Sequence, residues 1–178
     1  MIRTDKYVIY ETSIPQEERP RRELEDAAKS TLIREAFGND VSLAHDEHGA
    51  PYIPPRPDIH ISLSHSRDIC MLAVSDGPVG IDVENWRAQL NRVAAKFLTP
   101  AEMEMLGKLP DEQARERFLL KAWTAKEATF KAAHKPGLVL SEISLTPELN
   151  RAEARGCLFD IHYPPVTAGS VIAVAIPA

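Results

Sequence analysis

The stretch Gly80-Ile81-Asp82-Val83-Glu84, close to the middle of the chain, alternates polar and apolar side chains after its glycine. Such alternation is typical of a β-strand, in which successive side chains point to opposite faces. We therefore expect Asp82 and Glu84 on one face, with the two apolar residues on the other. Two carboxylates about 7 Å apart can share one hard cation. The spacing equally fits an edge strand with one solvated face, so both interpretations stay open here.

A second polar motif, Trp123-Thr-Ala-Lys-Glu-Ala-Thr-Phe-Lys131, lies in a segment, residues 113–133, whose pattern predicts a long amphipathic helix. Thr124, Glu127 and Lys131 recur at i, i+3 and i+7 and share one face of that helix. Trp123 belongs to the neighbouring apolar stripe, which favours a core contact. Taken alone, Glu127 and Lys131 also fit an i,i+4 ion pair at the surface.

The flanking sequence predicts a mixture of helices and strands. A helix is expected from Arg21 to Phe37, stopped by Gly38, and another begins at Thr99-Pro-Ala-Glu102, which has the residues of a capping box. Residues 41–58 hold four prolines and are expected to be mostly loop, with room for a short strand at the start. Because the elements do not strictly alternate, we predict an α+β fold rather than a doubly wound sheet. Strands are expected at residues 1–14, 59–63, 69–74 and 79–84, near Ile143, near Leu158 and over Val171–Ile176.

Composition excludes several classes of protein. The chain has 178 residues, enough for one domain or two small halves that share a core. Its formal net charge of −5 argues against a nucleic-acid partner, and its longest apolar stretch is too short to span a membrane. The first residues lack the apolar core of a secretory signal. Cys70 and Cys157 form no metal-type pair, so a reduced, cytoplasmic protein is expected.

Two histidine-containing stretches are weaker signals. Ser64-His65-Ser66 follows the strand predicted at residues 59–63, where a histidine flanked by hydroxyls can donate to phosphate oxygens. A histidine there also fits a turn residue bonded to backbone. The stretch His45-Asp-Glu-His48 has a spacing like that of a zinc motif. It precedes a Gly-Ala-Pro turn and has no third ligand at a useful spacing, which favours a solvated loop.

The order of these three blocks, Ser-His-Ser, Gly-Ile-Asp-Val-Glu and Trp-Thr-x-Lys-Glu-x-x-x-Lys, resembles the 4′-phosphopantetheinyl transferase superfamily. The resemblance extends from about Gly49 to Lys131 and includes Phe97-Leu-Thr-x-x-Glu102. The upstream Ser-His-Ser block points to a compact member of the surfactin-synthetase-activating type. One departure is Ala50, because many members have lysine or arginine between the corresponding glycine and proline.

The resemblance implies a role for each matching residue. Asp82, Glu84 and Glu127 resemble the magnesium-binding carboxylates, and Glu127 is also expected to accept a proton in catalysis. Lys126 and Lys131 resemble lysines near the pyrophosphate, with Lys131 expected to act in catalysis. Two residues match positions that contact coenzyme A, Ser64 and His65. Four basic residues lie where the family meets the 3′-phosphate of coenzyme A, namely Arg21, Arg22, Lys29 and Arg34.

The resemblance also implies a fold and an activity. Two similar α+β halves, residues 1–78 and 79–178, would form a pseudo-dimer with the active site between them. The implied reaction transfers 4′-phosphopantetheine from coenzyme A to a serine of an apo acyl or peptidyl carrier protein, with Mg²⁺, releasing 3′,5′-ADP. A monomer is expected, with a basic patch for an acidic carrier. The alternative is a non-catalytic module that binds coenzyme A or a carrier. Candidates for the patch are Arg115, Arg117 and Lys121.

Overall fold

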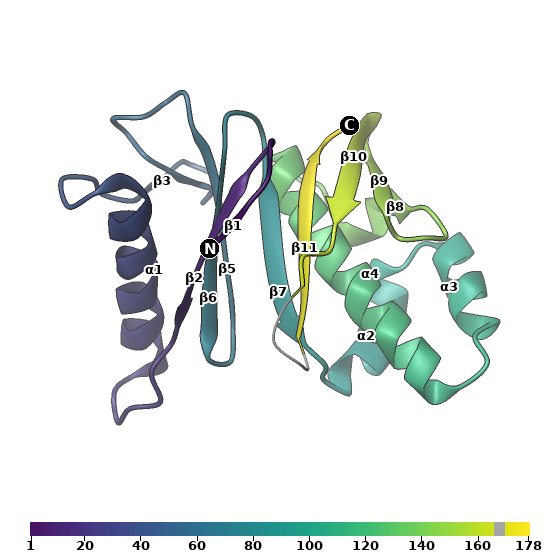
Figure 1. The fold of residues 1–178 in the computed structure, drawn as a ribbon. Helices are drawn as coiled ribbons and strands as arrows, with labels where there is room; N and C mark the ends of the chain where they lie inside the picture. The colour runs from purple at the N-terminus through teal and green to yellow at the C-terminus, as the bar shows by residue number, and fades with distance from the viewer. Residues whose placement is uncertain (166–169) are drawn as a thin grey trace.

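The computed structural model describes residues 1–165 and 170–178. Its architecture is mixed α+β with antiparallel sheets, as the sequence predicts. The layers follow one another in the order helix α1, first sheet, second sheet and helix α4 (Figure 1). Among the described residues, no helix combines the length and the apolar character needed to cross a bilayer.

The first sheet has the strand order β1-β2-β6-β5. Helix α1 (Arg21–Phe37) covers its outer face, where Leu32 packs in the same cluster as Leu72. The helix spans the predicted residues and ends at Gly38, whose φ of 91° directs its N–H to the carbonyl of Arg34. The strands are β1 (Ile2–Arg3), β2 (Val8–Ser13), β5 (His60–Ser66) and β6 (Ile69–Ser75); β3 (Ala44–His45) and β4 (Pro51–Tyr52) form a separate hairpin.

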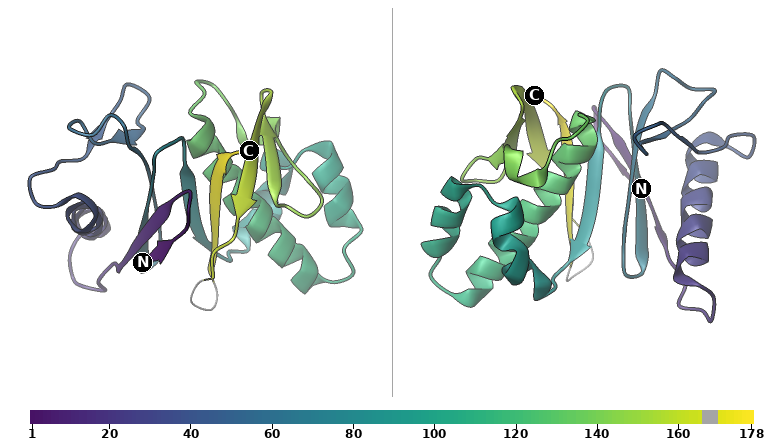
Figure 2. Two further views of the ribbon diagram at one scale, coloured as in Figure 1. Left: turned by 45° about the horizontal axis from the view of Figure 1, so that its top comes forward. Right: turned by 180° about the vertical axis from the view of Figure 1, so that it is seen from behind.

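The second sheet has the strand order β7-β11-β10-β9-β8. Helix α4 (Glu112–Ala133) runs along its outer face, and the view from behind in Figure 2 shows the shorter helices beside it. Helix α3 begins with the predicted capping box, in which Thr99 and Glu102 exchange hydrogen bonds. The remaining elements are β7 (Gly80–Asn85), α2 (Gln89–Phe97), α3 (Pro100–Gly107), a 3₁₀ turn (Leu140–Glu142), β8 (Ile143–Leu145), β9 (Arg151–Ala154), β10 (Cys157–His162) and β11 (Ser170–Pro177).

The two sheets share a connection order. In the first, β2 is followed by α1, β5 and β6, and β6 lies between β2 and β5. In the second, β7 is followed by α4, β10 and β11, and β11 lies between β7 and β10. This common pattern agrees with the idea of two similar halves. We propose that these halves form a pseudo-dimer and that they divide near residue 78.

The facing surfaces of the two sheets bury a shared core, to which the first sheet contributes Ile9 and the second Ile81 and Val83. At one edge of this core, serine hydroxyls of β5 contact β7. The Ser62 hydroxyl accepts a hydrogen bond from the Ile81 N–H at 3.0 Å, and the Ser64 hydroxyl accepts one from the Val83 N–H at 3.2 Å. Because β7 is an edge strand, these hydroxyls bind backbone donors that its sheet does not pair.

The structure differs from the predicted elements in five places. Strand β4 lies in the segment predicted to be mostly loop, and β5 continues through Ser64-His65-Ser66, which were expected to follow the strand. Residues 1–14 form a hairpin rather than one strand, because the Thr4 hydroxyl bonds to both the N–H and the carbonyl of Tyr7 and closes a turn. Strand β9 is a further element that the sequence pattern did not indicate. Helix α2 was also missed, although Leu90, Ala94 and Phe97 are buried at helical spacing.

Candidate active site

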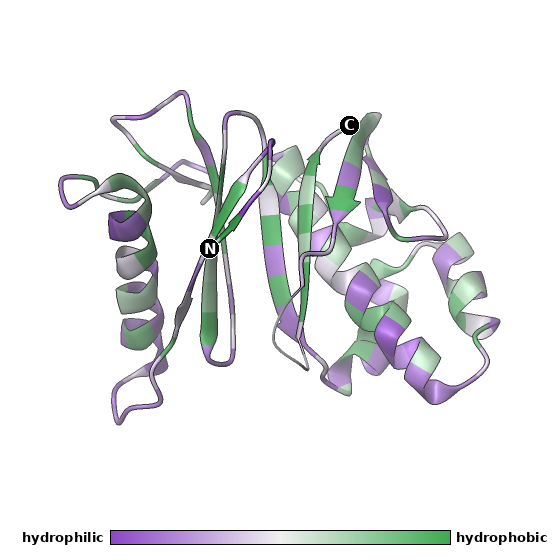
Figure 3. Cartoon of the chain, viewed as in Figure 1, coloured by the Kyte–Doolittle hydropathy of each residue, from purple (hydrophilic) through white to green (hydrophobic). Residues whose placement is uncertain are grey.

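Strand β7 and helix α4 approach so closely that only a glycine fits at one point between them. A Cβ atom added to Gly80 would lie 1.9 Å from the carbonyl oxygen of Ala128. This contact brings Asp82 and Glu84, which share the glycine's face of β7, next to α4. Figure 3 shows the alternation along β7, and its apolar residues Ile81 and Val83 are fully buried. The predicted strand and its two faces are therefore confirmed.

The Asp82 side chain is only 8% exposed and has two different oxygen environments. Its Oδ1 accepts hydrogen bonds from the Ser64 hydroxyl and the Lys131 ammonium, each at 2.8 Å. Its Oδ2 is buried and has no hydrogen-bond partner among the described residues. A buried acceptor without a partner costs about 1–3 kcal/mol, so this oxygen is an open ligand position. The solvated-edge interpretation is wrong for Asp82.

Lys131 connects α4 to β7. Its ammonium donates to the Ile81 carbonyl at 2.9 Å as well as to Asp82. The alternative interpretation, a surface pair between Lys131 and Glu127 along the helix, does not describe this geometry. The lysine instead places a positive charge beside the buried carboxylate of the neighbouring strand.

Glu84 and Glu127 lie in the electric field of Asp82. Burial raises the pKa of Glu84 and of Glu127, and the negative charge of Asp82 raises each further. Arg87 pairs with Glu84 at 2.5 Å and offsets part of the repulsion. The site therefore holds more negative charge than its neighbouring cations neutralise, which favours the binding of a further cation.

Mg²⁺ is a cation that these residues could hold. Among the described residues, no three His, Cys, Asp or Glu side chains are grouped to enclose a metal ion by themselves. Mg²⁺, however, usually takes one or two protein carboxylates and completes its shell with water and substrate phosphates. The open Oδ2 of Asp82, with Glu84 and Glu127 nearby, fits that mode of binding.

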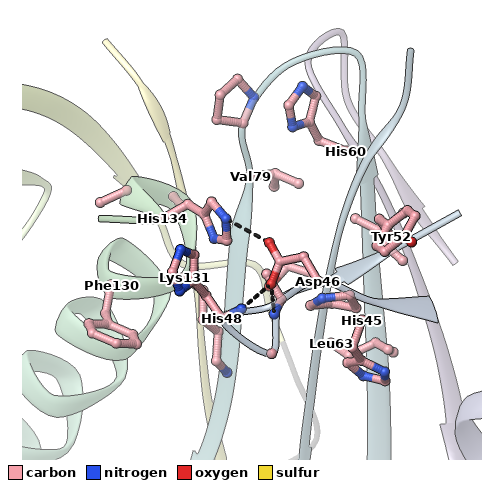
Figure 4. A pocket seen from close by; sticks show the side chains of 18 of the residues that line it. His45, Asp46, His48, Tyr52, His60, Leu63, Val79, Phe130, Lys131 and His134 are labelled. Atoms are coloured by element: carbon pink, nitrogen blue, oxygen red, sulfur yellow. Dashed lines mark hydrogen bonds and ion pairs between the residues drawn. The ribbon is translucent and has the colours of Figure 1, made fainter. Parts of the chain in front are cut away.

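A cavity of about 1160 Å³ lies next to Lys131 and is lined by both halves of the chain. The β3–β4 hairpin and β5 line it from the first half, and the end of α4 lines it from the second (Figure 4). Figure 4 shows Phe130 and Tyr52 on opposite sides of this space, and both are exposed. The cavity is large enough for a nucleotide-sized ligand.

A smaller cavity of about 420 Å³ reaches Glu84, Arg87 and Arg21, and His65 lines both cavities. The His65 Nδ1 lies 3.5 Å from the Glu25 carboxylate. Burial lowers the pKa of His65, and Glu25 opposes that shift. The structure thus places His65 on the wall of both cavities, and its role as a coenzyme A ligand stays a proposal.

The basic residues of α1 divide into two groups. Lys29 lines the larger cavity and Arg21 the smaller one. Arg22 is 92% exposed and lies 3.9 Å from Asp26, and Arg34 contacts Thr31 on its own helix. Arg22 and Arg34 line neither cavity, so the structure does not bring these two predicted ligands to the site. Their positions on α1 point them to solvent.

Two further predicted ligands, Ser64 and Lys126, have buried side chains. The Ser64 side chain is buried, and its hydroxyl is bonded to Asp82 and to the Val83 N–H, so it positions the carboxylate. Lys126 is fully buried, with its ammonium 2.7 Å from Glu102 and bonded to backbone carbonyls. No donor of Lys126 faces a cavity, because it points away from the Lys131 side of α4 into the core.

Sequence reasoning missed several residues that the structure places at or near the site. Glu102 was quoted only as part of a motif, yet it pairs with Lys126 and also accepts from the Leu145 N–H at 2.9 Å. Arg87 follows the Glu84 motif by three residues, a spacing that could have indicated the pair. No sequence signal indicated that Asp46 and His134 meet, at 2.9 Å.

Comparison with known proteins identifies the class. Residues 78–163 match the model of the 4′-phosphopantetheinyl transferase superfamily. This range holds β7, α4 and all three carboxylates of the site. Over these residues the chain is a member of the superfamily, and the resemblance predicted from the three blocks is confirmed.

Individual relatives agree with that class. A 4′-phosphopantetheinyl transferase of Bacillus subtilis is 34% identical over 124 residues, which cover 67% of this chain and 54% of the relative. The 4′-phosphopantetheinyl transferase HetI of Nostoc sp. is 35% identical over 115 residues, covering 60% of this chain and 48% of the relative. AcpT of Escherichia coli (strain K12) is 34% identical over 119 residues, covering 63% and 58%. The chain thus spans about half the length of the curated relatives it matches.

Proposed function

We propose that this protein transfers 4′-phosphopantetheine from coenzyme A to a serine hydroxyl of an apo acyl or peptidyl carrier protein. The observation that carries the proposal is the buried Asp82, fixed by Ser64 and Lys131 through one oxygen and open at the other. Relatives named 4′-phosphopantetheinyl transferases support the reaction class.

In this reaction the serine oxygen forms a bond to the β-phosphorus of coenzyme A. The bond from that phosphorus to the bridging oxygen breaks, and 3′,5′-ADP leaves with the electron pair. Asp82, Glu84 and Glu127 would hold Mg²⁺, which would supply positive charge to the pyrophosphate. Lys131 lies beside the same carboxylate and is placed to stabilise the charge that develops on the leaving phosphate.

Glu127 is the proposed acceptor of the serine proton, directly or through a water. A general base is most efficient when its pKa lies near the working pH, which is above the pKa of an ordinary glutamate. Burial and the charge of Asp82 raise the pKa of Glu127 in that direction. Glu127 lies four residues before Lys131 on α4. The proposed base and the lysine that would stabilise the leaving phosphate therefore share one face of the helix.

The carrier and the state of the protein complete the proposal. Arg117 and Lys121 are i,i+4 neighbours on α4 and, together with Arg115, could meet an acidic carrier. Lys121 is exposed, and its ammonium also lies 4.8 Å from the centre of the Tyr163 ring. We expect a monomer, because all the walls of the larger cavity belong to one chain. We also expect a cytoplasmic location, because Cys70 and Cys157 are free thiols.

A non-catalytic module that binds coenzyme A or a carrier is the alternative. The test incubates the protein with several apo carrier proteins, coenzyme A and Mg²⁺, and reads each carrier by mass spectrometry. A carrier that gains the mass of one phosphopantetheine supports the transferase. This gain should disappear with the Asp82→Asn variant and when Mg²⁺ is removed. Binding of coenzyme A without any modified carrier would support the alternative instead.

A further inference from the structure

Two positively charged side chains contact the carboxylates of β7, and they are held in different ways. Lys131 donates to Asp82 and to the Ile81 carbonyl, and its side chain is 28% exposed. Arg87 contacts Glu84 at 2.5 Å, and its side chain is 50% exposed. The lysine is therefore fixed by two acceptors on β7, whereas the arginine has room to move away from its carboxylate.

The backbone of Arg87 is fixed although its guanidinium is exposed. The residue lies between β7 and α2, and its carbonyl accepts a hydrogen bond from the Leu90 N–H at 3.0 Å, at the start of α2. Glu84 is three residues earlier, near the end of β7, and its side chain is only 17% exposed. This short connection brings the guanidinium back to the partly buried carboxylate.

The ring of Trp123 gives the guanidinium a second support. The Cζ atom of Arg87 lies 5.9 Å from the centre of this ring, a distance typical of a cation–π contact. The ring packs edge to face against the buried Phe97, with centroids 5.1 Å apart, so its position is set by the core. Because the indole carries no charge, it supports the guanidinium without neutralising it. Arg87 can therefore release Glu84 and keep a favourable contact in the same place.

We propose that Arg87 takes the place of a divalent cation at Glu84 and competes with Mg²⁺ for this carboxylate. The proposal rests on the magnesium site of the proposed function. In the protein without metal, the Arg87–Glu84 pair offsets part of the charge of the three neighbouring carboxylates. The guanidinium would be repelled by a divalent ion on the open Oδ2 of Asp82. Metal binding therefore requires Arg87 to give up Glu84 and to stay at the Trp123 ring.

The role assigned to Arg87 is that of a positioning residue, because it acts through Glu84. This role predicts a sign that a merely structural contact does not. If Arg87 only supported the fold of the site, its removal would weaken metal binding. The removal of a competitor strengthens metal binding instead, so the direction of the change separates the two roles.

The test measures the affinity for Mn²⁺ without coenzyme A by electron paramagnetic resonance, at one pH and one ionic strength. Mn²⁺ takes the same carboxylate and water ligands as Mg²⁺. Arg87→Gln removes the charge and should bind the ion about fivefold more tightly than the unmodified chain, as expected for a partly exposed ion pair. Arg87→Lys keeps the charge and should stay within about twofold of the unmodified chain. Thermal unfolding without metal verifies that each variant is folded.

Arg67→Asn is the matched control. Arg67 lines the same smaller cavity, and none of the ion pairs between described residues joins it to Glu84. Its φ is 45°, a left-handed conformation that asparagine tolerates, so the change removes a charge without adding backbone strain. The affinity for Mn²⁺ should change by less than about twofold.

A double-mutant cycle tests whether Arg87 acts through Glu84. In a Glu84→Gln background, Arg87→Gln should change the affinity by less than about twofold, because the contested carboxylate is gone. An unchanged or weaker affinity of Arg87→Gln, or an equal gain in both backgrounds, would overturn the proposal. If Asp82→Asn still abolishes Mn²⁺ binding in that case, the metal site of the proposed function stands while the role of Arg87 fails. Absence of Mn²⁺ binding by the unmodified chain, with or without coenzyme A, would remove both.

Discussion

The two ends of the site hold their polar groups in different ways. On the β7–α4 side, Asp82 is buried, and Lys131 is fixed by its contacts with the neighbouring strand. On the α1 side, Arg22 pairs only with a neighbour on its own helix and is almost fully exposed. Contacts between different elements therefore separate side chains with one defined position from side chains that are free to adapt. The following experiments test whether this difference also divides catalysis from ligand attraction.

The largest effect should come from Glu127→Gln, which preserves size but removes basicity and charge from the buried side. We expect the kcat for carrier modification to fall by about 10²- to 10⁴-fold, the usual contribution of a general base. Coenzyme A affinity should change much less, because the contacts of the cavity remain. Steady-state kinetics with calorimetry separates the two quantities. A near-normal kcat would show that Glu127 is not the base.

A second large effect should follow from Lys126→Met in the core of the same half. This change leaves the Glu102 carboxylate buried without its ion-pair partner. The free energy of unfolding should fall by about 3–5 kcal/mol, measured by urea denaturation. The double variant Lys126→Met, Glu102→Gln removes both charges and should recover part of that loss. If Lys126→Met is as stable as the unmodified chain, the buried pair does not hold α4 in place.

Gly80→Ala should cost about 1–3 kcal/mol of stability, as overpacking usually does. The new Cβ would meet the Ala128 carbonyl at 1.9 Å, so α4 must move away from β7. That movement separates Lys131 from Asp82 and should lower carrier modification along with stability. Gly77→Ala is the control, because an added Cβ meets nothing within 4 Å there. Equal stability of the two variants would contradict the close approach.

The part of the site that the sequence could predict is the part fixed by secondary structure. The alternation from Gly80 to Glu84 and the helical spacing of Glu127 and Lys131 each define a face, and the structure brings these faces together. The meeting of Asp46 with His134 depends on how two halves pack, which no local pattern contains.

Lys126 shows a different limit of sequence reasoning. It is adjacent to Glu127 in a polar motif, but one step along a helix turns a side chain by about 100°. Its side chain therefore enters the core beside Glu102, whereas Glu127 lies near enough to Asp82 for that charge to raise its pKa. A motif identifies neighbours in the sequence without separating the residues that bind a ligand from those that hold the helix.

The smallest effect concerns α1, where Lys29 and Arg22 form a matched pair. Both carry one positive charge, and both lie within 4 Å of Asp26. Only Lys29 lines the larger cavity, and its side chain is 27% exposed against 92% for Arg22. Lys29→Ala should weaken coenzyme A binding by about fivefold, and Arg22→Ala by less than about twofold.

Neither substitution should change the free energy of unfolding by more than about 0.5 kcal/mol, because both side chains are at the surface. Calorimetry at low and high salt distinguishes contact from general attraction, since salt screens distant charges more than close ones. Equal losses for the two variants, abolished by salt, would mean that α1 attracts the anion only through its overall field. If only Lys29→Ala weakens binding, Lys29 contacts coenzyme A at the cavity wall and Arg22 does not.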